Sequence, residues 1–293
     1  MSHAVTTPNE PIELGLSLSD GWRPRVHQVP AASDNLCWLI EYREGEVAVV
    51  DGPGATELKA YLSLHGLRLT HLLNTHTHGD HIGVNRALER AGELEGLEVW
   101  GSALAPSPIP GLTRALREGE RFKLGELEGL VWLTEGHLNG HISLIIGSPS
   151  EALALFCGDT LFCAGCGYVF DGPMSVMAES LDRLSALTPS CLVFCAHEYT
   201  LDNLHFALSL EPSSEALRAR VHQARSLRAE GRSTVPSRLA EELATNPFLR
   251  FESPELRAAI GAEPGASRAA IFELTRRLKD SKRYRERALE ELL

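Results

Sequence analysis

The sequence lacks long apolar runs and is poor in cysteine, and both absences narrow the class of protein. No apolar run approaches the roughly 20 residues that a helix needs to cross a bilayer, so we expect no membrane-spanning segment. The first twenty residues contain no basic stretch followed by an apolar one, which predicts no signal peptide. Six cysteines in 293 residues do not make a disulfide scaffold, and four of them lie in apolar runs typical of reduced core residues. Together these features favour a cytoplasmic protein.

Basic residues are also scarce relative to acidic ones. The chain has 28 Lys and Arg against 39 Asp and Glu, which gives a formal net charge of −11. A chain with this excess of negative charge repels phosphate backbones, so nucleic acid is not an expected partner. The sequence also has no internal repeat and no low-complexity tract, which excludes repeat architectures and extensive disorder.

The order of the expected elements divides the chain into two parts. Up to about residue 200, short runs rich in Val, Ile and Leu predict strands, with a few helices between them. The expected strands cover residues 37–42, 46–50, 69–74, 98–100, 130–133, 142–146, 153–157 and 192–195, and the helices 56–64, 84–91 and 176–187. Beyond residue 200, expected helices cover residues 201–210, 214–230, 237–245, 254–260 and 267–287. The sequence therefore predicts an α/β domain at residues 1–200 and a smaller helical domain at residues 201–293.

The densest chemical signal is the segment THTHGDH at residues 75–81, directly after an expected strand. In an extended segment residues i and i+2 face the same side, so His76 and His78 can direct both imidazoles at one point. Gly79 lets the chain turn, and Asp80 and His81 can then approach the same point from the other side. Three imidazoles and a carboxylate so close together predict a site for a divalent metal such as zinc, iron or manganese.

Three further ligand-type side chains stand where a buried strand is expected to end: His137, Asp159 and His197. That edge of the sheet is where α/β folds build their sites, and the repeated placement predicts that these residues join the histidine segment. We expect His141 to support a ligand by hydrogen bonding or to lie in the core. Asp51 is expected to be a supporting or loop residue.

These motifs resemble the signature T-H-x-H-x-D-H of the metallo-β-lactamase superfamily, and the order of the three later ligand-type residues matches it as well. Within that superfamily, the chain resembles glyoxalase II, the hydroxyacylglutathione hydrolase family, over residues 36–284. The motifs that carry this resemblance are GDTLFCAGCG at 158–167, CAHEYTLDN at 195–203, NPFLR at 246–250 and RRLKD at 276–280. The resemblance implies a four-layer αββα metallo-β-lactamase sandwich with a smaller C-terminal helical domain.

The resemblance also implies two divalent metal ions, with zinc expected first and iron or manganese as alternatives. By this resemblance the first ion would be held by His76, His78 and His137, the second by Asp80, His81 and His197, and both by the bridging Asp159. A metal-bridging hydroxide would attack the carbonyl of a thioester, above all S-D-lactoylglutathione, and would yield D-lactate and glutathione. Asp80 and Asp159 would be the catalytic carboxylates.

The partner that the resemblance implies is a small-molecule glutathione thioester bound by a monomer. The implied substrate contacts are Tyr168, Phe170, Tyr199, Arg276 and Lys279. Arg276 and Lys279 would meet the glycine carboxylate of glutathione, since guanidinium groups suit carboxylates. A solvated helix face is the alternative interpretation of the basic run around them. The family usually carries Lys or Arg after AGCG, where this chain has Tyr168, so we expect weak glutathione binding.

Other functions stay open on the sequence alone. A hydrolase of the same superfamily that acts on another acyl thiol or on a lactone would need the same metal ligands. A metal-dependent binding protein without activity would be marked by lost ligands, and none is lost here. Persulfide dioxygenase relatives normally lack the long helical tail, and nuclease relatives fit poorly with the acidic charge.

Overall fold

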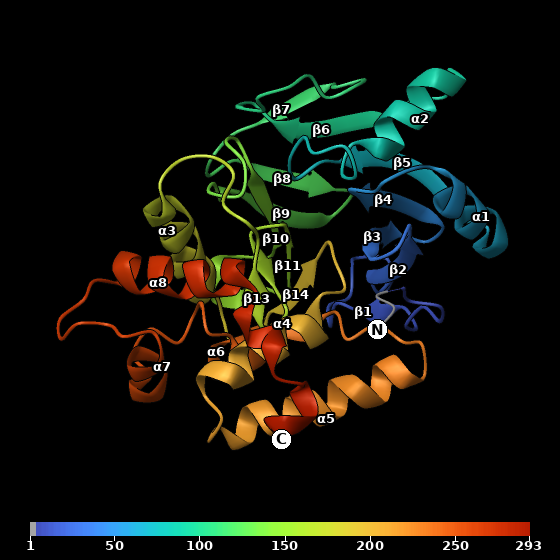
Figure 1. Cartoon of the computed structure of the whole chain (residues 1–293). Coiled ribbons are helices and arrows are strands. Elements are labelled where there is room, and N and C mark those ends of the chain that lie inside the picture. Colours follow the sequence, from blue (N-terminus) through green and yellow to red (C-terminus); the bar gives the residue numbers. More distant parts are fainter. Residues whose placement is uncertain (1–3) are drawn as a thin grey trace.

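The computed structural model describes residues 4–293, in which two mixed β-sheets lie at the centre and helices lie outside them (Figure 1). The first sheet has, in spatial order, β1 (Ile12–Glu13), β2 (Arg25–Ala31), β3 (Asn35–Arg43), β4 (Glu46–Val50), β5 (Arg68–Leu73), β6 (Glu98–Ser102) and β7 (Arg114–Leu116). The second has β15 (Ser237–Arg238), β14 (Leu192–Cys195), β11 (Ala154–Gly158), β10 (Ile142–Ile146), β9 (Leu127–Leu133) and β8 (Arg121–Leu124). A separate hairpin is formed by β12 (Leu161–Phe162) and β13 (Gly165–Cys166).

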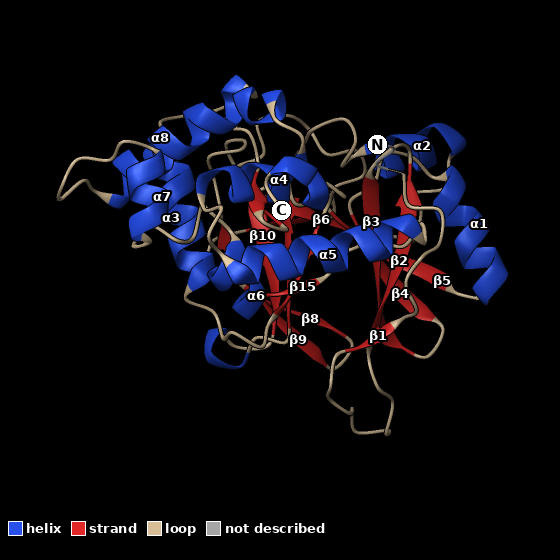
Figure 2. Cartoon of the chain, turned by 60° about the horizontal axis from the view of Figure 1, so that its bottom comes forward, coloured by secondary structure: helices blue, strands red, loops and turns tan. Residues whose placement is uncertain are grey.

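The helices cover the outer faces of both sheets, as Figure 2 shows. The first sheet is covered by α1 (Thr56–His65) and α2 (Gly83–Ala91), and the other side of the molecule carries α3 (Met174–Ser185), α4 (Thr200–Leu210), α5 (Glu215–Ala229), α6 (Leu239–Thr245), α7 (Pro254–Ala259) and α8 (Arg268–Ser281). Short 3₁₀ helices are η1 (Pro149–Glu151), η2 (Arg283–Glu286) and η3 (Leu289–Glu291). Within residues 4–293, no helix combines the length and the apolar character that crossing a membrane requires.

Strand β3 shows why the sequence has nearly continuous apolar runs. Leu39 packs in a cluster with the residues of α1 and α2, whereas its neighbours Trp38 and Ile40 belong to the core between the sheets. Successive side chains of a strand point to opposite faces, and here both faces are buried. Alternating polar residues would therefore be costly, and the strand is apolar throughout its middle.

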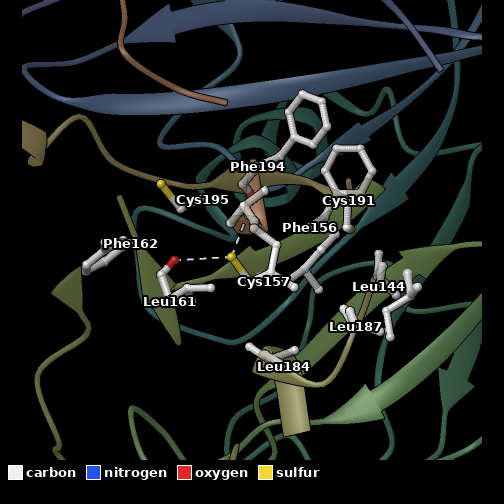
Figure 3. Packing of buried hydrophobic residues seen from close by; sticks show 14 of the residues in the cluster. Leu144, Phe156, Cys157, Leu161, Phe162, Leu184, Leu187, Cys191, Phe194 and Cys195 are labelled. Carbon is white, nitrogen blue, oxygen red and sulfur yellow. Dashed lines mark hydrogen bonds between the residues drawn. The ribbon is translucent and has the colours of Figure 1, made fainter. Parts of the chain in front are cut away.

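Cys157 illustrates the state of the cysteines in this core. Figure 3 shows it among Phe156, Phe194 and Leu184, with its Sγ donating to the carbonyl oxygen of Leu161 at 3.1 Å. Burial raises the pKa of the Cys157 thiol well above its usual value. All six cysteines are free and buried, which confirms the prediction of reduced core residues.

The structure corrects several predicted boundaries. The helix predicted at residues 237–245 is wrong at its start, because Ser237 and Arg238 pair antiparallel with β14 and form β15. The helix predicted at 267–287 ends at Ser281, because Lys282 adopts a left-handed backbone with φ 56°. The sequence analysis missed β1, β2, β7, β8, β12 and β13, most of which are short or carry polar residues.

The helical region shares its core with the second sheet. Three phenylalanines are fully buried in the same hydrophobic cluster as Leu144 and Phe156. They are Phe206 of α4, Phe248 in the loop after α6, and Phe272 of α8. These contacts fix the position of the helices against the sheet, next to the loops that follow β11 and β14.

Candidate metal centre

The structure brings the seven predicted ligand-type residues together at one edge of the two sheets. The segment with the three histidines follows β5, and the other residues follow β9, β11 and β14. Strands β4 and β5 are parallel, and so are β11 and β14, so their carboxyl ends reach the same edge. The residues gathered there are His76, His78, Asp80, His81, His137, Asp159 and His197.

Glycines allow the chain segments to approach each other at this edge. Gly158 ends β11 with φ +46°, and a Cβ there would lie 2.4 Å from Oγ1 of Thr75. A Cβ at Gly167 would lie 1.9 Å from the carbonyl oxygen of Asp159. Any larger residue at either position would displace the loops that carry His76 and Asp159.

The first group of ligand atoms surrounds a common point. Nδ1 of His78 lies 3.1 Å from Nε2 of His76 and 2.9 Å from Nε2 of His137. Nε2 of His137 lies 3.3 Å from Oδ2 of Asp159. Ligands held tetrahedrally around zinc at ordinary bond lengths are about 3.3 Å apart, so these separations suit a small divalent cation.

The second group has the same spacing. Nε2 of His81 and Nε2 of His197 each lie 3.4 Å from Oδ1 of Asp159. Oδ2 of Asp80 lies 3.4 Å from Nε2 of His197. The two carboxylate oxygens of Asp159 thus face the two groups separately, an arrangement suited to a residue shared by two ions.

Unpartnered buried atoms provide an independent test of whether metal ions fit this site. Nε2 of His81 and Oδ1 of Asp159 are buried and have no hydrogen-bond partner among the described residues. Such atoms destabilise a fold unless they meet a partner. Imidazole nitrogens with carboxylate oxygens, and no thiolate, suit zinc, iron and manganese alike. The residues present therefore fit a pair of divalent cations.

The electrostatics of the cluster differ between its two groups of histidines. Although burial acts in the opposite direction, His81 and His197 hold the pKa of Asp159 well below its usual value, so its carboxylate is ionised. Burial lowers the pKa of His76 and of His137, so both imidazoles offer lone pairs. Burial acts in the same direction on His81 and His197, but the carboxylate of Asp159 outweighs it and raises the pKa of both, so these two rings would release a proton on binding a cation.

Hydrogen bonds orient the ligand-type side chains. Asp51 accepts from Nδ1 of His81 at 2.9 Å and from the hydroxyl of Thr75 at 2.6 Å. Nε2 of His141 accepts from the backbone N–H of Asp159 at 3.2 Å. Asp51 and His141 therefore fix the positions of His81 and Asp159, as expected of supporting residues.

Two supporting residues escaped the sequence analysis. Asp34 accepts from Nδ1 of His197 at 2.8 Å, and this hydrogen bond lowers the pKa of Asp34 to about 2. Asn35 donates through Nδ2 to Oδ2 of Asp80 at 3.1 Å. Asp34 lies in the turn between β2 and β3 and Asn35 is the first residue of β3, far from the histidine segment in sequence, and the local signal was a turn-type Ser-Asp-Asn at the start of a strand.

Replacing Asp34 with asparagine should weaken the centre without removing a ligand. The loss of the charged acceptor frees the ring of His197 to turn and lowers its basicity, so we expect metal affinity or activity to fall by about 10- to 100-fold. Competition with a chelator measures the affinity. Asp20→Asn is the matched control, because Asp20 is exposed and, within residues 4–293, accepts a hydrogen bond from the backbone of Trp22 alone. Equal metal affinity in both variants would exclude this role for Asp34.

A cavity of about 240 Å³ lies beside the cluster. Its wall includes Tyr199, whose ring stacks on His197 with centroids 4.9 Å apart and planes 2° apart. The lining residues are Phe162, Cys166, Tyr168, Tyr199, Asp202, Asn203, Arg276, Lys279 and Arg285. Four of the five predicted substrate contacts thus line one cavity. Phe170 is not among them and lies edge-on to His78 and His137, with centroids 5.2 and 5.3 Å away.

The predicted basic contacts in this cavity already have partners. Arg276 donates from Nε to Asp280 at 2.9 Å and from Nη1 to the carbonyl oxygen of Cys166 at 3.2 Å. Nζ of Lys279 lies 2.9 Å from Oδ2 of Asp202, and burial lowers the pKa of Lys279 to about 8. Both side chains are buried, so they do not form the solvated helix face that was the alternative.

Comparisons with known families cover nearly the whole described chain. Residues 32–197 match the metallo-beta-lactamase superfamily, and residues 198–282 match the hydroxyacylglutathione hydrolase C-terminus. A hydroxyacylglutathione hydrolase from Methylococcus capsulatus is 46% identical over 87% of this chain and 97% of its own length. One from Rhodospirillum rubrum is 43% identical over the same shares.

Solved structures agree on the fold. ETHE1 from Myxococcus xanthus superposes with a TM-score of 0.55 at 23% identity, over 83% of this chain and 86% of that one. The BLEG-1 B3 metallo-beta-lactamase gives a TM-score of 0.55 at 19% identity, over 77% and 99%. At these identities the likeness establishes the fold of this chain and nothing about its substrate.

Proposed function

This chain belongs to the hydroxyacylglutathione hydrolase family, and we propose that it hydrolyses S-2-hydroxyacylglutathione thioesters, S-D-lactoylglutathione first among them. The observation that carries the proposal is the position of Asp159, whose two oxygens face two groups of imidazoles beside a cavity with a net cationic wall. We propose zinc as the first choice for both ions. The six free cysteines suit a reducing compartment, which supports a place in the cytoplasm.

The chemistry divides between the bound ions and the chain. When bound, two divalent cations lower the pKa of water enough to supply hydroxide near pH 7 and stabilise the negative charge that develops on the oxygen of a thioester carbonyl. The chain aligns the reactants. Asn35 holds Asp80 at the open side of the cluster, where the side chains of His78 and Asp80 are half-buried. Thiolate is a good leaving group, so the reaction needs no protein side chain as general acid.

The thiol part of the substrate is assigned to the cavity beside the cluster. Tyr199 and Phe162 both contact the ring of His197, so this cavity opens directly beside the proposed reaction centre. In the proposal the glutathione chain extends past Tyr199 and Tyr168 toward the cationic wall. Phe170, 59% exposed and against His78, is assigned to the mouth of the site.

Adding a positive charge at Tyr168 should strengthen substrate binding. Tyr168 is 52% exposed at the cavity, on the same wall as the cationic side chains, and a partly solvated contact with a carboxylate is worth about 1 kcal/mol. We therefore expect Tyr168→Lys to lower KM for S-D-lactoylglutathione roughly three- to tenfold, with kcat nearly unchanged. Tyr168→Phe, which changes no charge, is the matched control.

Steady-state kinetics of the metal-loaded protein on S-D-lactoylglutathione, lactoyl-coenzyme A and a lactone test the substrate class. The proposal requires the glutathione thioester to be the best of the three. A lactone that is turned over far faster would leave the metal centre intact and overturn the substrate.

A further inference from the structure

The cavity beside the metal centre contains one cationic side chain that lies outside the region matched by the family. Arg285 belongs to η2, which follows α8 and contacts α4 at the C-terminal end of the chain (Figure 1). The match to the hydroxyacylglutathione hydrolase C-terminus ends at residue 282. Arg285 nevertheless lines the same cavity as Tyr168 and Tyr199. It is a candidate substrate contact that lies three residues beyond the end of this match.

The three cations of this cavity differ in how far they are already committed. Nε, Nη1 and Nη2 of Arg276 all have partners, and its side chain is 7% exposed. Lys279 pairs with Asp202 and lies over the rings of Phe206 and Tyr284, with its side chain 9% exposed. Neither side chain can turn toward a ligand without breaking buried contacts.

Arg285 differs from these two side chains both in its exposure and in the number of its nitrogens that already have partners. Its side chain is 49% exposed, and it pairs with Oδ1 of Asp202 through Nε at 2.9 Å and Nη2 at 2.7 Å. No hydrogen bond from its Nη1 to any described residue is present. One edge of this guanidinium is therefore fixed by Asp202, and Nη1 is available to a ligand.

The charge balance of the cavity also favours Arg285 as the cation that binds a ligand. Arg276 is matched by Asp280, whereas Lys279 and Arg285 share the single carboxylate of Asp202. One positive charge is left without a carboxylate, and it lies on the exposed side, at Arg285. A monoanionic group would complete the balance, and guanidinium binds carboxylates with well-defined geometry.

We propose that Arg285 binds the terminal glycine carboxylate of the glutathione thioester. This inference rests on the function proposed above. Within glutathione the γ-glutamyl carboxylate is balanced by its own ammonium group, so the glycine carboxylate is the end with uncompensated negative charge. Asp202 positions Arg285 for this contact, and Arg276 and Lys279 shape the wall behind it.

A comparison of two substrates tests the proposal in the full-length, metal-loaded protein. One is S-D-lactoylglutathione, and the other is its glycinamide analogue, in which the terminal carboxylate is a neutral amide. The parent should show a KM about tenfold higher for the amide, because a charge-assisted contact is lost. In Arg285→Ala the KM for the natural substrate should rise by a similar factor, and the difference between the two substrates should disappear. Values of kcat should change little, since the contact is remote from the reacting carbonyl.

Arg283→Ala is the matched control. Arg283 lies in the same 3₁₀ helix, is 78% exposed in its side chain and, among the described residues, pairs with Glu286 at 3.9 Å. It should keep the parent's preference for the carboxylate, and Arg285→Lys should keep part of it. If Arg285→Ala still prefers the carboxylate tenfold, with an unchanged Tm, another side chain binds it and the inference is wrong. If the parent hydrolyses neither thioester, the proposed function itself fails.

Discussion

Replacing Asp159 with asparagine is expected to lower kcat/KM for thioester hydrolysis by at least about a thousandfold, or ~4 kcal/mol of transition-state stabilisation. Its two oxygens lie 3.3 to 3.4 Å from the Nε2 atoms of His137, His81 and His197, and the residue is 7% exposed. Asparagine offers one carbonyl oxygen and no negative charge, so at least one proposed ion loses a ligand and both lose the charge that balances them. Steady-state kinetics and metal analysis of the purified variant measure the effect.

Two further variants give activity losses with which the loss in Asp159→Asn can be compared. His141→Gln should cost less, about 10- to 100-fold, because the ring of His141 hydrogen-bonds to the backbone of Asp159 and to neighbouring hydroxyl groups and stacks on His76, but supplies no proposed ligand atom. Asp182→Asn removes a carboxylate on α3 that pairs with Arg268, and it should leave activity unchanged within about twofold. An Asp159→Asn protein that retains both metals and hydrolyses at the parent's rate would show that Asp159 was assigned the wrong role.

The second large effect is expected on stability, at Glu242 of α6. This side chain is fully buried and accepts from the backbone N–H of Ala164 at 2.7 Å, from Asn246 at 3.1 Å and from the buried Arg220. Glu242→Ala leaves the guanidinium of Arg220 buried without its closest carboxylate, so we expect the free energy of unfolding to fall by ~3–5 kcal/mol. Urea titration followed by circular dichroism measures the loss.

Neighbouring residues separate this effect from a general loss of helix α6. Glu241→Ala, at a more exposed position with a 3.5 Å contact to the same arginine, should cost less than about 1 kcal/mol. Adding Arg220→Met to Glu242→Ala should recover part of the stability, because the unpaired charge is gone. A Glu242→Ala protein as stable as the parent would mean that this buried pair does not join the helices to the β12–β13 hairpin.

The ligand-type residues have a local signal in the sequence, because most of them lie shortly after a predicted strand. The runs that form β11 and β14 are apolar and β5 ends in two buried leucines, and Asp159, His197 and His76 follow shortly after these strands. Once these strands form, their direction determines the edge of the sheet at which these side chains lie. The physical constraint on the site is therefore mostly local in sequence.

The residues that orient the ligands could not be predicted in the same way. Asp34 is 163 positions from His197 along the chain, and only the pairing of β2 with β3 and the arrangement of the sheets bring their side chains within 2.8 Å. Arg285 belongs to a basic run whose members look alike in sequence, and the structure alone distinguishes it from Arg283 by its contact with Asp202. Strand β15 was missed for a related reason, since Ser237 and Arg238 are a strand only because β14 has a free edge there.

The central claim is that this chain holds two divalent ions that share Asp159 and that hydrolysis depends on both. The most direct measurement is the metal content per chain in metal-loaded parent and His197→Ala protein, with thioester hydrolysis assayed on the same samples. The account predicts two ions per chain in the parent, and in the variant one ion together with a loss of most activity. A parent that binds one ion at saturation, with His197→Ala fully active, would contradict it.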